Sequence, residues 1–286
     1  MTRPRVVTIV THRRPDEVRP ALDVLRRLAR ERGVTLRFDA DEVRKHDLTQ
    51  AEGMELDAEI HADVDLCLVL GGDGSILSAL RHYLGTGVPV FAVNYGEVGF
   101  LATVDPDGLE EGLGRALDGD FDAMSLPAID LRSPGGTDWW AINDVSFHRK
   151  PGLRVADLSY AIGTDEVGRV RCDGVVVATP AGSTGYNLAN GGPVMAWGVE
   201  GYVVSFIAPH SLTARALVVA PDDPLVVRNR SREEATDVTV DGTIVGELQA
   251  GEAMEVRFQD DKAVLAQLAG ATFYHRLRER FGRLAS

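Results

Sequence analysis

The sequence predicts an α/β protein with two domains, an N-terminal α/β domain followed by a C-terminal domain made mostly of β-strands. The chain has 286 residues, which provides two hydrophobic cores at roughly 150 residues per domain. Apolar strand-like runs alternate with amphipathic helical segments up to about residue 123. After Pro127 short β-type runs separated by Gly, Pro and Asp turns dominate. The change in texture places the domain boundary near residue 123.

The α/β domain, residues 1–123, begins with a β-branched strand from Val6 to Val10 and continues with a helix from about Asp16 to Arg32. One face of this helix is apolar: Val18, Leu22, Leu25, Leu28 and Ala29. Further strands are expected at Val34 to Phe38, Asp65 to Leu70 and Val88 to Val93. The uninterrupted apolar run at 65–70 is typical of a parallel strand that is covered on both faces.

The β-rich domain is assigned to residues 124–265. Its strands are expected at Ala128–Leu131, Trp139–Phe147, Leu158–Ile162, Val175–Thr179, Val203–Ile207, Leu225–Val227, Asp237–Val240 and Met254–Phe258. Helical spacing returns from Phe273 to Leu284. Whether residues 266–286 pack back on the first domain is left open.

Charge and composition exclude several classes of protein. Forty-three acidic residues against thirty basic ones give a net charge of -13, which repels phosphate backbones, so nucleic acid is not expected as a partner. No stretch approaches the roughly 18 apolar residues of a spanning helix, so no membrane association is expected. The N-terminus lacks an apolar signal core, and the two cysteines, Cys67 and Cys172, lie in apolar surroundings. These features predict a reduced, cytoplasmic protein without disulfides.

The first motif is Gly71-Gly72-Asp73-Gly74-Ser75, between a buried strand and a helix. Glycines let backbone N–H groups approach an anion, and a helix N-terminus adds partial positive charge, so the motif predicts phosphate binding. It is neither a Walker A loop, since no Gly-Lys-Ser/Thr follows, nor Gly-x-Gly-x-x-Gly, since Leu77 takes the third position. Asp73 is either a helix N-cap, or a carboxylate that accepts the proton of an attacking hydroxyl or helps to hold Mg²⁺.

The second motif runs from Cys172 through Tyr186 and leads to Gly191-Gly192-Pro193. An apolar strand ends in a Thr-Pro turn that offers small side chains, N–H donors and an aromatic ring, which suits a nucleotide. A polar turn before a helix is the alternative interpretation. A serine hydrolase elbow is excluded because Ala181 stands where Gly-x-Ser-x-Gly requires glycine. Asn143-Asp144 and Asp241-Gly242 are ordinary turn residues when each is taken alone.

Taken together, the motifs resemble those of the NAD kinases, in the family's order and over nearly the whole chain. The first motif alone is shared with diacylglycerol, sphingosine and phosphofructokinase-type kinases, whereas the ordered set is specific. The matching segments are Gly71 to Ser75, Asn94 to Leu101, Asn143-Asp144, Asp173 to Pro193, Pro209 to Arg215, and Val240-Asp241-Gly242.

The resemblance implies a phosphofructokinase-like N-terminal α/β domain, a C-terminal β-sandwich domain, and an active site between them. It implies transfer of a phosphoryl group from ATP or polyphosphate to the 2′-hydroxyl of the adenosine ribose of NAD(H), which gives NADP(H). A divalent cation, Mg²⁺ or another, is implied as cofactor, with its protein ligands unknown. A homodimer or homotetramer that associates through the C-terminal domain is also implied.

The family's site residues carry over by matching motif. Asp73 would be the base that activates the hydroxyl, Gly72 and Gly74 would shape the phosphate loop, and Phe100 would line the adenosine pocket. The remaining roles fall in the second domain: Asn143 and Asp144 on ribose hydroxyls, Thr184, Gly185 and Tyr186 on the adenine side, Asp173 on the adenine amino group of a neighbouring subunit, and Asp241 on the nicotinamide side. Arg13 and Arg14 are either donor-phosphate contacts or solvated surface charge.

Three positions depart from the family pattern. Asp144 stands where the family usually has Glu, Gly185 where it has Ala, and Ala189 where it commonly has Ser. These departures leave substrate affinity and the preference for NAD or NADH open. A kinase for a lipid or another nucleoside, and a catalytically silent NAD-binding sensor, are the alternative functions. The negative charge disfavours the lipid kinase, and the intact Asp73 with its glycines disfavours the sensor.

Overall fold

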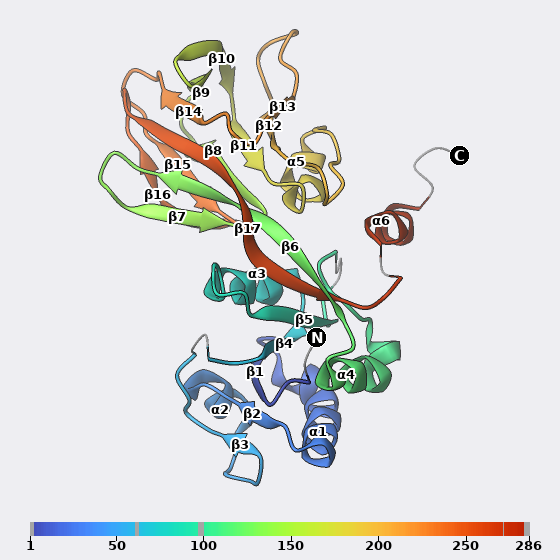
Figure 1. The fold of residues 1–286 in the computed structure, drawn as a ribbon. Helices are drawn as coiled ribbons and strands as arrows, with labels where there is room; N and C mark the ends of the chain where they lie inside the picture. Colours follow the sequence, from blue (N-terminus) through green and yellow to red (C-terminus); the bar gives the residue numbers. More distant parts are fainter. Residues whose placement is uncertain (1–2, 61–62, 97–99, 271, 283–286) are drawn as a thin grey trace. The chain divides into compact units, whose positions relative to one another are not determined.

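The computed structural model describes residues 3–60, 63–96, 100–270 and 272–282 and divides into two compact units (Figure 1). Unit 1 comprises residues 1–125 and 262–286, and unit 2 comprises residues 126–261. The chain passes between the units within two strands, β6 (Asp122–Arg132) and β17 (Ala253–Gln267). The sequence places its domain limits at residues 123 and 265, inside these same two strands.

Unit 1 contains a parallel sheet with the strand order β17-β5-β4-β1-β2-β3. Its other strands are β1 (Val6–Thr11), β2 (Thr35–Arg37), β3 (Met54–Glu55), β4 (Leu66–Gly71) and β5 (Pro89–Asn94). Every residue of β4 and β5 is buried, as expected for central strands covered on both faces. The α/β architecture predicted for this half of the chain is confirmed.

Along the chain, the helices of unit 1 alternate with its strands. They are α1 (Pro15–Arg32), α2 (Ala40–His46), α3 (Asp73–His82), η1 (Pro106–Gly108), α4 (Leu109–Asp118) and α6 (Phe273–Phe281). The five apolar residues predicted on one face of α1 are all at most 5% exposed. Gly33 ends this helix in the left-handed conformation, φ +66°. No helix in the described part of the chain is long and apolar enough to cross a membrane.

Segment 262–286 belongs to unit 1. Val264 and Leu265 of β17 pair with Pro89 and Val90 of β5. The guanidinium of Arg276, on α6, donates to the carbonyl oxygens of Phe100 and Ala102. These bonds join residues distant in sequence into the same compact unit.

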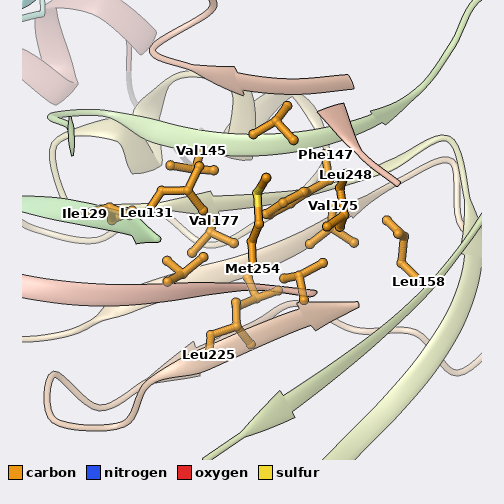
Figure 2. Close-up of a cluster of buried hydrophobic side chains, with 14 of the residues drawn as sticks. Ile129, Leu131, Val145, Phe147, Leu158, Val175, Val177, Leu225, Leu248 and Met254 are labelled. Atoms are coloured by element: carbon orange, nitrogen blue, oxygen red, sulfur yellow. The ribbon is translucent and has the colours of Figure 1, made fainter. Parts of the chain in front are cut away.

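Unit 2 is a sandwich of two antiparallel sheets. One sheet has the order β13-β12-β11-β8-β15-β16, and the other contains β10, β9, β14 and β17, with β6 pairing β17 and β7. Its strands are β7 (Asp138–Ala141), β8 (Asp144–Arg149), β9 (Ala156–Ile162), β10 (Asp165–Cys172), β11 (Gly174–Ala178), β12 (Tyr202–Ile207), β13 (Leu217–Val219), β14 (Leu225–Asn229), β15 (Thr236–Val240) and β16 (Thr243–Leu248). Phe147 and Val177 of the first sheet and Leu225 and Met254 of the second meet in one core (Figure 2). The β-rich second half is confirmed.

Two predictions for unit 2 need correction. The run Trp139–Phe147 is not one strand, because β7 ends at Ala141 and β8 begins at Asp144. Strands β10, β13 and β16 were not predicted. Most residues of β10 and β16 are exposed or half-buried, so their sequences lack the apolar alternation that marks a strand. Cys67 and Cys172 are both buried and free.

Candidate active site

The glycine motif connects β4 to α3 in unit 1. Gly72 is the N-cap residue of α3, and its carbonyl oxygen accepts the N–H groups of Ser75 (2.9 Å) and Ile76 (3.1 Å). A Cβ atom on Gly72 would lie 3.0 Å from the Cα of Gly96, and one on Gly96 would lie 2.8 Å from the Cα of Gly72. The two backbones therefore touch where only glycine fits. Gly74 is exposed, with open space where a side chain would be.

Asp73 is the first residue of α3, and its carboxylate points to a different segment. Oδ2 accepts the N–H of Phe100 (3.1 Å) and Oδ1 accepts the N–H of Leu101 (3.2 Å). The capping interpretation is wrong, because Gly72 holds the N-cap position and no side chain caps the helix. An ionised carboxylate has about four lone-pair sites, so two backbone bonds leave room for a further donor. Asp73 is thus fixed in orientation and still able to accept a proton.

Phe100 contributes its backbone to this arrangement. Its ring is 4% exposed and packs in unit 1 against Phe273 (centroids 6.0 Å apart) and Phe281 (5.8 Å). Residues 97–99 of the motif Asn94 to Leu101 lie outside the described residues. The predicted contact of Phe100 with adenosine is not tested by this packing.

A cavity of about 290 Å³ lies beside the glycine motif. It is lined by His12, Arg13, Gly72, Gly74 and Ser75. The first turn of α3 brings its partial positive charge to this cavity, and Arg13 brings a full one. The combination suits an anion such as a phosphate group.

A buried polar cluster holds Thr11, the residue before His12 and Arg13 in the cavity lining. The carboxylate of Glu42, on α2, accepts the N–H of Thr11 (2.9 Å), the hydroxyl of Thr11 (2.6 Å) and the ammonium of Lys45 (2.6 Å). The hydroxyl oxygen of Thr11 lies 2.7 Å from Nε2 of His46. Burial lowers the pKa of His46, with Glu42 acting in the opposite direction. The cluster fixes the end of β1 next to His12 and Arg13.

In unit 2 the two turn motifs lie together. Asp241 and Gly242 connect β15 to β16 with φ of +45° and +77°, a two-residue hairpin turn with both central residues left-handed. The carboxylate of Asp241 accepts the N–H groups of Ile142 (3.1 Å), Asn143 (2.7 Å) and Asp144 (3.1 Å). These bonds occupy the backbone of residues 142–144, which explains why β7 and β8 are separate strands.

Asp144 lies beside Asp241 in a different environment. It is 7% exposed, and among the described residues no group donates a hydrogen bond to its carboxyl group. Burial raises the pKa of Asp144 to about 7, and the neighbouring charge of Asp241 adds to this effect. The carboxyl group therefore exchanges its proton near neutral pH.

The loop after β11 packs on the same turn. The hydroxyl of Thr179 donates to the carbonyl oxygen of Ile142 (2.6 Å), and the N–H of Thr179 donates to that of Asn143 (2.9 Å). A Cβ atom on Gly182 would lie 2.0 Å from the Asn143 oxygen, so only glycine fits there. The amide of Asn187, fully buried, donates to Ser183 O and Pro193 O (both 2.9 Å) and closes the loop.

Four more predicted residues lie on or beside this loop. The ring of Tyr186 is 37% exposed and stacks on His148, with centroids 5.5 Å apart and planes at 16°. Burial raises the pKa of Tyr186, and the charges of Asp144 and Asp173 contribute. Asp173 accepts a hydrogen bond from Arg149. The remaining two have these environments: the hydroxyl of Thr184 donates to Ala181 O (3.2 Å), and a Cβ atom on Gly185 would meet only Gly182 O, at 3.4 Å.

Comparison with known proteins decides the family. Residues 9–121 match the family model of the ATP-NAD kinase N-terminal domain, and residues 142–268 match that of the ATP-NAD kinase C-terminal domain. The NAD kinase of Syntrophotalea carbinolica is 32% identical over 272 residues, which cover 94% of each chain. The chain belongs to the NAD kinase family. Its members are phosphotransferases that act on an alcohol group.

One further relative and two solved structures agree with this family assignment. The NAD kinase of Gemmatimonas aurantiaca is 35% identical over 226 residues, which cover 77% of this chain and 78% of the relative. Yeast NADH kinase complexed with NADH has the same fold, with a TM-score of 0.88 at 20% identity over 99% of this chain and 89% of that one. The NAD kinase from Archaeoglobus fulgidus in complex with ATP has a TM-score of 0.73 at 24% identity over 97% of each chain.

Within this NAD kinase the predicted residues form one group in each unit. Asp73, Gly72, Gly74 and the backbone of Phe100 form the group in unit 1. In unit 2 Asp241, Asn143 and Asp144 are directly bonded, and Thr184, Gly185 and Tyr186 lie on the loop that packs against them. The sequence does not predict several supporting residues. These are His148, which stacks on Tyr186, Glu42, which accepts hydrogen bonds from Thr11, and Thr179 and Asn187 in the loop after β11. Only the last two lie in a recognisable motif.

Proposed function

We propose that this NAD kinase transfers the terminal phosphoryl group of ATP to the 2′-hydroxyl of the adenosine ribose of NAD, with Asp73 as the acceptor of the hydroxyl proton. One observation carries the assignment of Asp73: its carboxylate, in the middle of the glycine motif, is held by the backbone N–H groups of Phe100 and Leu101, with lone pairs remaining. The yeast relative complexed with NADH and the Archaeoglobus fulgidus relative complexed with ATP support NAD(H) as acceptor and ATP as donor.

On the donor side the chain's own groups bind and orient phosphate. The backbone at Gly72 and Gly74 and the guanidinium of Arg13 line the cavity beside α3, where negative charge is stabilised. Transfer of a phosphoryl group depends mainly on positioning and on electrostatic stabilisation of the equatorial oxygens. We assign the ATP phosphates, or a polyphosphate chain in their place, to this cavity.

Asp73 would act on the acceptor hydroxyl. As the ribose oxygen forms its bond to the γ-phosphorus, the bond from phosphorus to the leaving ADP oxygen breaks and the hydroxyl proton passes to Asp73. Because two N–H donors fix the carboxylate, it is oriented for this proton before substrate arrives. A positioned base of this kind contributes a rate factor on the order of 10²–10⁴.

The residues of unit 2 would bind the dinucleotide. We propose that Asn143 and Asp144 bind ribose hydroxyls and that Thr184, Gly185 and Tyr186 receive the adenine, with the half-exposed ring of Tyr186 available for stacking. Asp241 holds the backbone of residues 142–144 in place. Its contact with the nicotinamide side, and the contact of Phe100 with adenosine, remain predictions.

A divalent cation, Mg²⁺ in particular, fits the donor set beside the glycine motif. Mg²⁺ in such sites is bound by one or two carboxylates together with substrate phosphates. We propose Asp73 as one of them, since it lies within the glycine motif, although it is not part of the cavity lining. When bound, the ion would neutralise part of the charge on the transferring phosphates. In the described part of the chain no three His, Cys, Asp or Glu side chains form a metal-binding group.

We further propose a homodimer or homotetramer in which Asp173 binds the adenine amino group of a neighbouring subunit's substrate. The carboxylate of Asp173 is 33% exposed and oriented by Arg149, so it has a lone pair for such a donor. A cytoplasmic location is proposed from the two buried, reduced cysteines.

The deciding experiment incubates the purified chain with Mg²⁺, NAD or NADH, and either ATP or polyphosphate, and detects NADP(H) with an NADP-specific dehydrogenase. We expect NADP(H) from ATP in the wild type, loss of product when EDTA removes the cation, and little product from Asp73→Asn. The polyphosphate arm decides the donor, and the NADH arm decides the acceptor preference. Binding of NAD without NADP formation from any donor would instead identify a silent NAD-binding sensor.

A further inference from the structure

A second cavity, of about 430 Å³, lies in unit 2 and is lined by none of the predicted site residues. It is bordered by β9, by β10 and by the segments 154–155 and 230–234. Five of its lining residues are arginines: Arg154, Arg169, Arg171, Arg230 and Arg232. Only two carboxylates, Asp157 and Glu234, line it as well. In a chain of net charge -13 this concentration of positive charge is a local exception.

Strand geometry brings these arginines together. Side chains alternate along β10, so Val170 and Cys172 are buried in the core while Arg169 and Arg171 face outward. Arg171 lies opposite Asp157 in the antiparallel pairing of β10 with β9. The N–H of Arg230, just after β14, donates to Asp157 O (2.7 Å), which brings a third arginine to the same place.

The arginines differ in their partners. Arg169 donates to both carboxylate oxygens of Asp157 (2.7 and 2.6 Å), and Arg230 donates to Glu166 (2.8 Å). For Arg154, Arg171 and Arg232, the described residues supply no side-chain hydrogen bond or ion pair. The arginines also lower the pKa of Asp157, chiefly through the hydrogen bond from Arg169, with the charges of Arg171 and Arg230 adding. Three guanidinium groups at the cavity are therefore not hydrogen-bonded to a carboxylate of any described residue.

We propose that this cavity binds a chain of three or more phosphates, either inorganic polyphosphate or the triphosphate of a nucleotide. One guanidinium group can donate two parallel hydrogen bonds to the oxygens of one phosphate group. Several guanidinium groups around one cavity therefore match a ligand with several phosphate groups. The volume lies within the range of small-molecule sites, roughly 300–1,000 Å³. A single inorganic phosphate meets only part of the set and binds more weakly. The proposal does not depend on the role of Asp73.

Calorimetry with inorganic tripolyphosphate tests the site. The test variant is Arg154→Gln with Arg232→Gln, two exposed positions at the cavity. The matched control is Arg26→Gln with Arg30→Gln on α1, which removes the same charge outside the cavity. Thermal unfolding of both variants checks that they are folded.

We expect the wild type and the control to bind tripolyphosphate at two sites, this cavity and the one proposed beside α3, and the test variant to lose binding at this cavity by at least tenfold while it keeps the other site. Titration with ATP in a second arm identifies the source of the phosphate chain, since a nucleotide site binds ATP more tightly than tripolyphosphate. Equal binding by the test variant and the control overturns the proposal, as does equal weakening of both. NADP formation is assayed in parallel, so failure of this site and failure of the proposed kinase reaction are separate results.

Discussion

Two of the predicted site carboxylates, Asp73 in unit 1 and Asp144 in unit 2, have contrasting environments. Asp73 is half-buried, and two backbone N–H groups donate to it. Asp144 is 7% exposed, and no hydrogen-bond donor to its carboxyl group is present among the described residues. Burial without hydrogen-bond donors favours the neutral form of the Asp144 carboxyl group.

The two environments suit the two carboxylates to different tasks. A carboxylate that is fixed in orientation accepts a proton without reorganising, which is the role proposed for Asp73. A group whose pKa lies near 7 changes between donor and acceptor of hydrogen bonds at neutral pH, which suits binding of a hydroxyl by Asp144. Substitutions at these two carboxylates, at Asp241 and at Ala189 test the roles assigned to them.

Asp73→Asn removes the proton acceptor and keeps the size of the side chain. We expect kcat to fall by a factor on the order of 10²–10⁴, because that is the contribution of a positioned general base. The affinity for NAD, measured by calorimetry, should change little, since other residues are assigned to dinucleotide binding. Near wild-type turnover in this variant would remove Asp73 from the chemistry.

Asp241→Ala deletes the acceptor of three backbone N–H bonds. We expect the free energy of unfolding to fall by about 2–4 kcal/mol, because donors are left unsatisfied in a partly buried turn. Urea denaturation measures the loss. Asp241→Asn is the matched control, because its amide oxygen keeps part of the acceptor, so its loss should be smaller. Equal, small losses in both would show that the turn is held by other contacts.

Asp144→Asn isolates the cost of a buried charge. The folded-state pKa of Asp144, about 7, lies above the ordinary value of 3.8, so the folded protein keeps a proton that the unfolded chain loses. Wild-type stability therefore falls as pH rises from about 4 to 7, and the variant escapes this loss. We expect the variant to be more stable by about 1–3 kcal/mol at pH 8 and nearly equal at pH 4. A difference that is constant across pH would contradict the assignment.

Ala189→Ser restores the hydroxyl common in the family at the end of α5 (Tyr186–Ala189), where Ala189 is exposed. We expect NAD to bind more tightly by about 0.5–1.5 kcal/mol if the new hydroxyl makes a net hydrogen bond. Calorimetry with NAD measures the change. Unchanged or weaker binding would mean that the contacts around the ribose are complete without this hydroxyl.

The sequence predicts those parts of the fold whose signal is local. Parallel strands covered on both faces are continuous apolar runs, so β1, β4 and β5 are recognisable, and α1 shows its apolar face. Strand β10 was missed because its outward residues are charged and include a glycine. Its pairing with β9, not its own pattern, makes it a strand.

The candidate site divides in the same way. The glycine motif is contiguous, so the sequence alone identifies its residues. The hydrogen bonds of Asp73 to the N–H groups of Phe100 and Leu101 could not be predicted, because those residues lie 27 and 28 positions away. Asp241 and Asn143 are 98 positions apart, and only resemblance to the family brought them into one prediction. The environment of Asp144 and the clustering of arginines from three segments depend on tertiary packing, which no local pattern records.

Unit 1 is discontinuous along the chain, and this has a consequence for synthesis on the ribosome. Domains generally fold in the order in which they are made. Here Pro89 and Val90 of β5 pair with Val264 and Leu265 of β17. The hydroxyl of Thr103 donates to the carbonyl oxygen of Ala266. All of unit 2 must be translated before these partners exist. Residues 103 and 104 already bond to Ala92 and Asn94 of β5 within the α/β half. The edge of β5 at Pro89 and Val90 stays unpaired until β17 is made, and this edge depends on protection from premature aggregation.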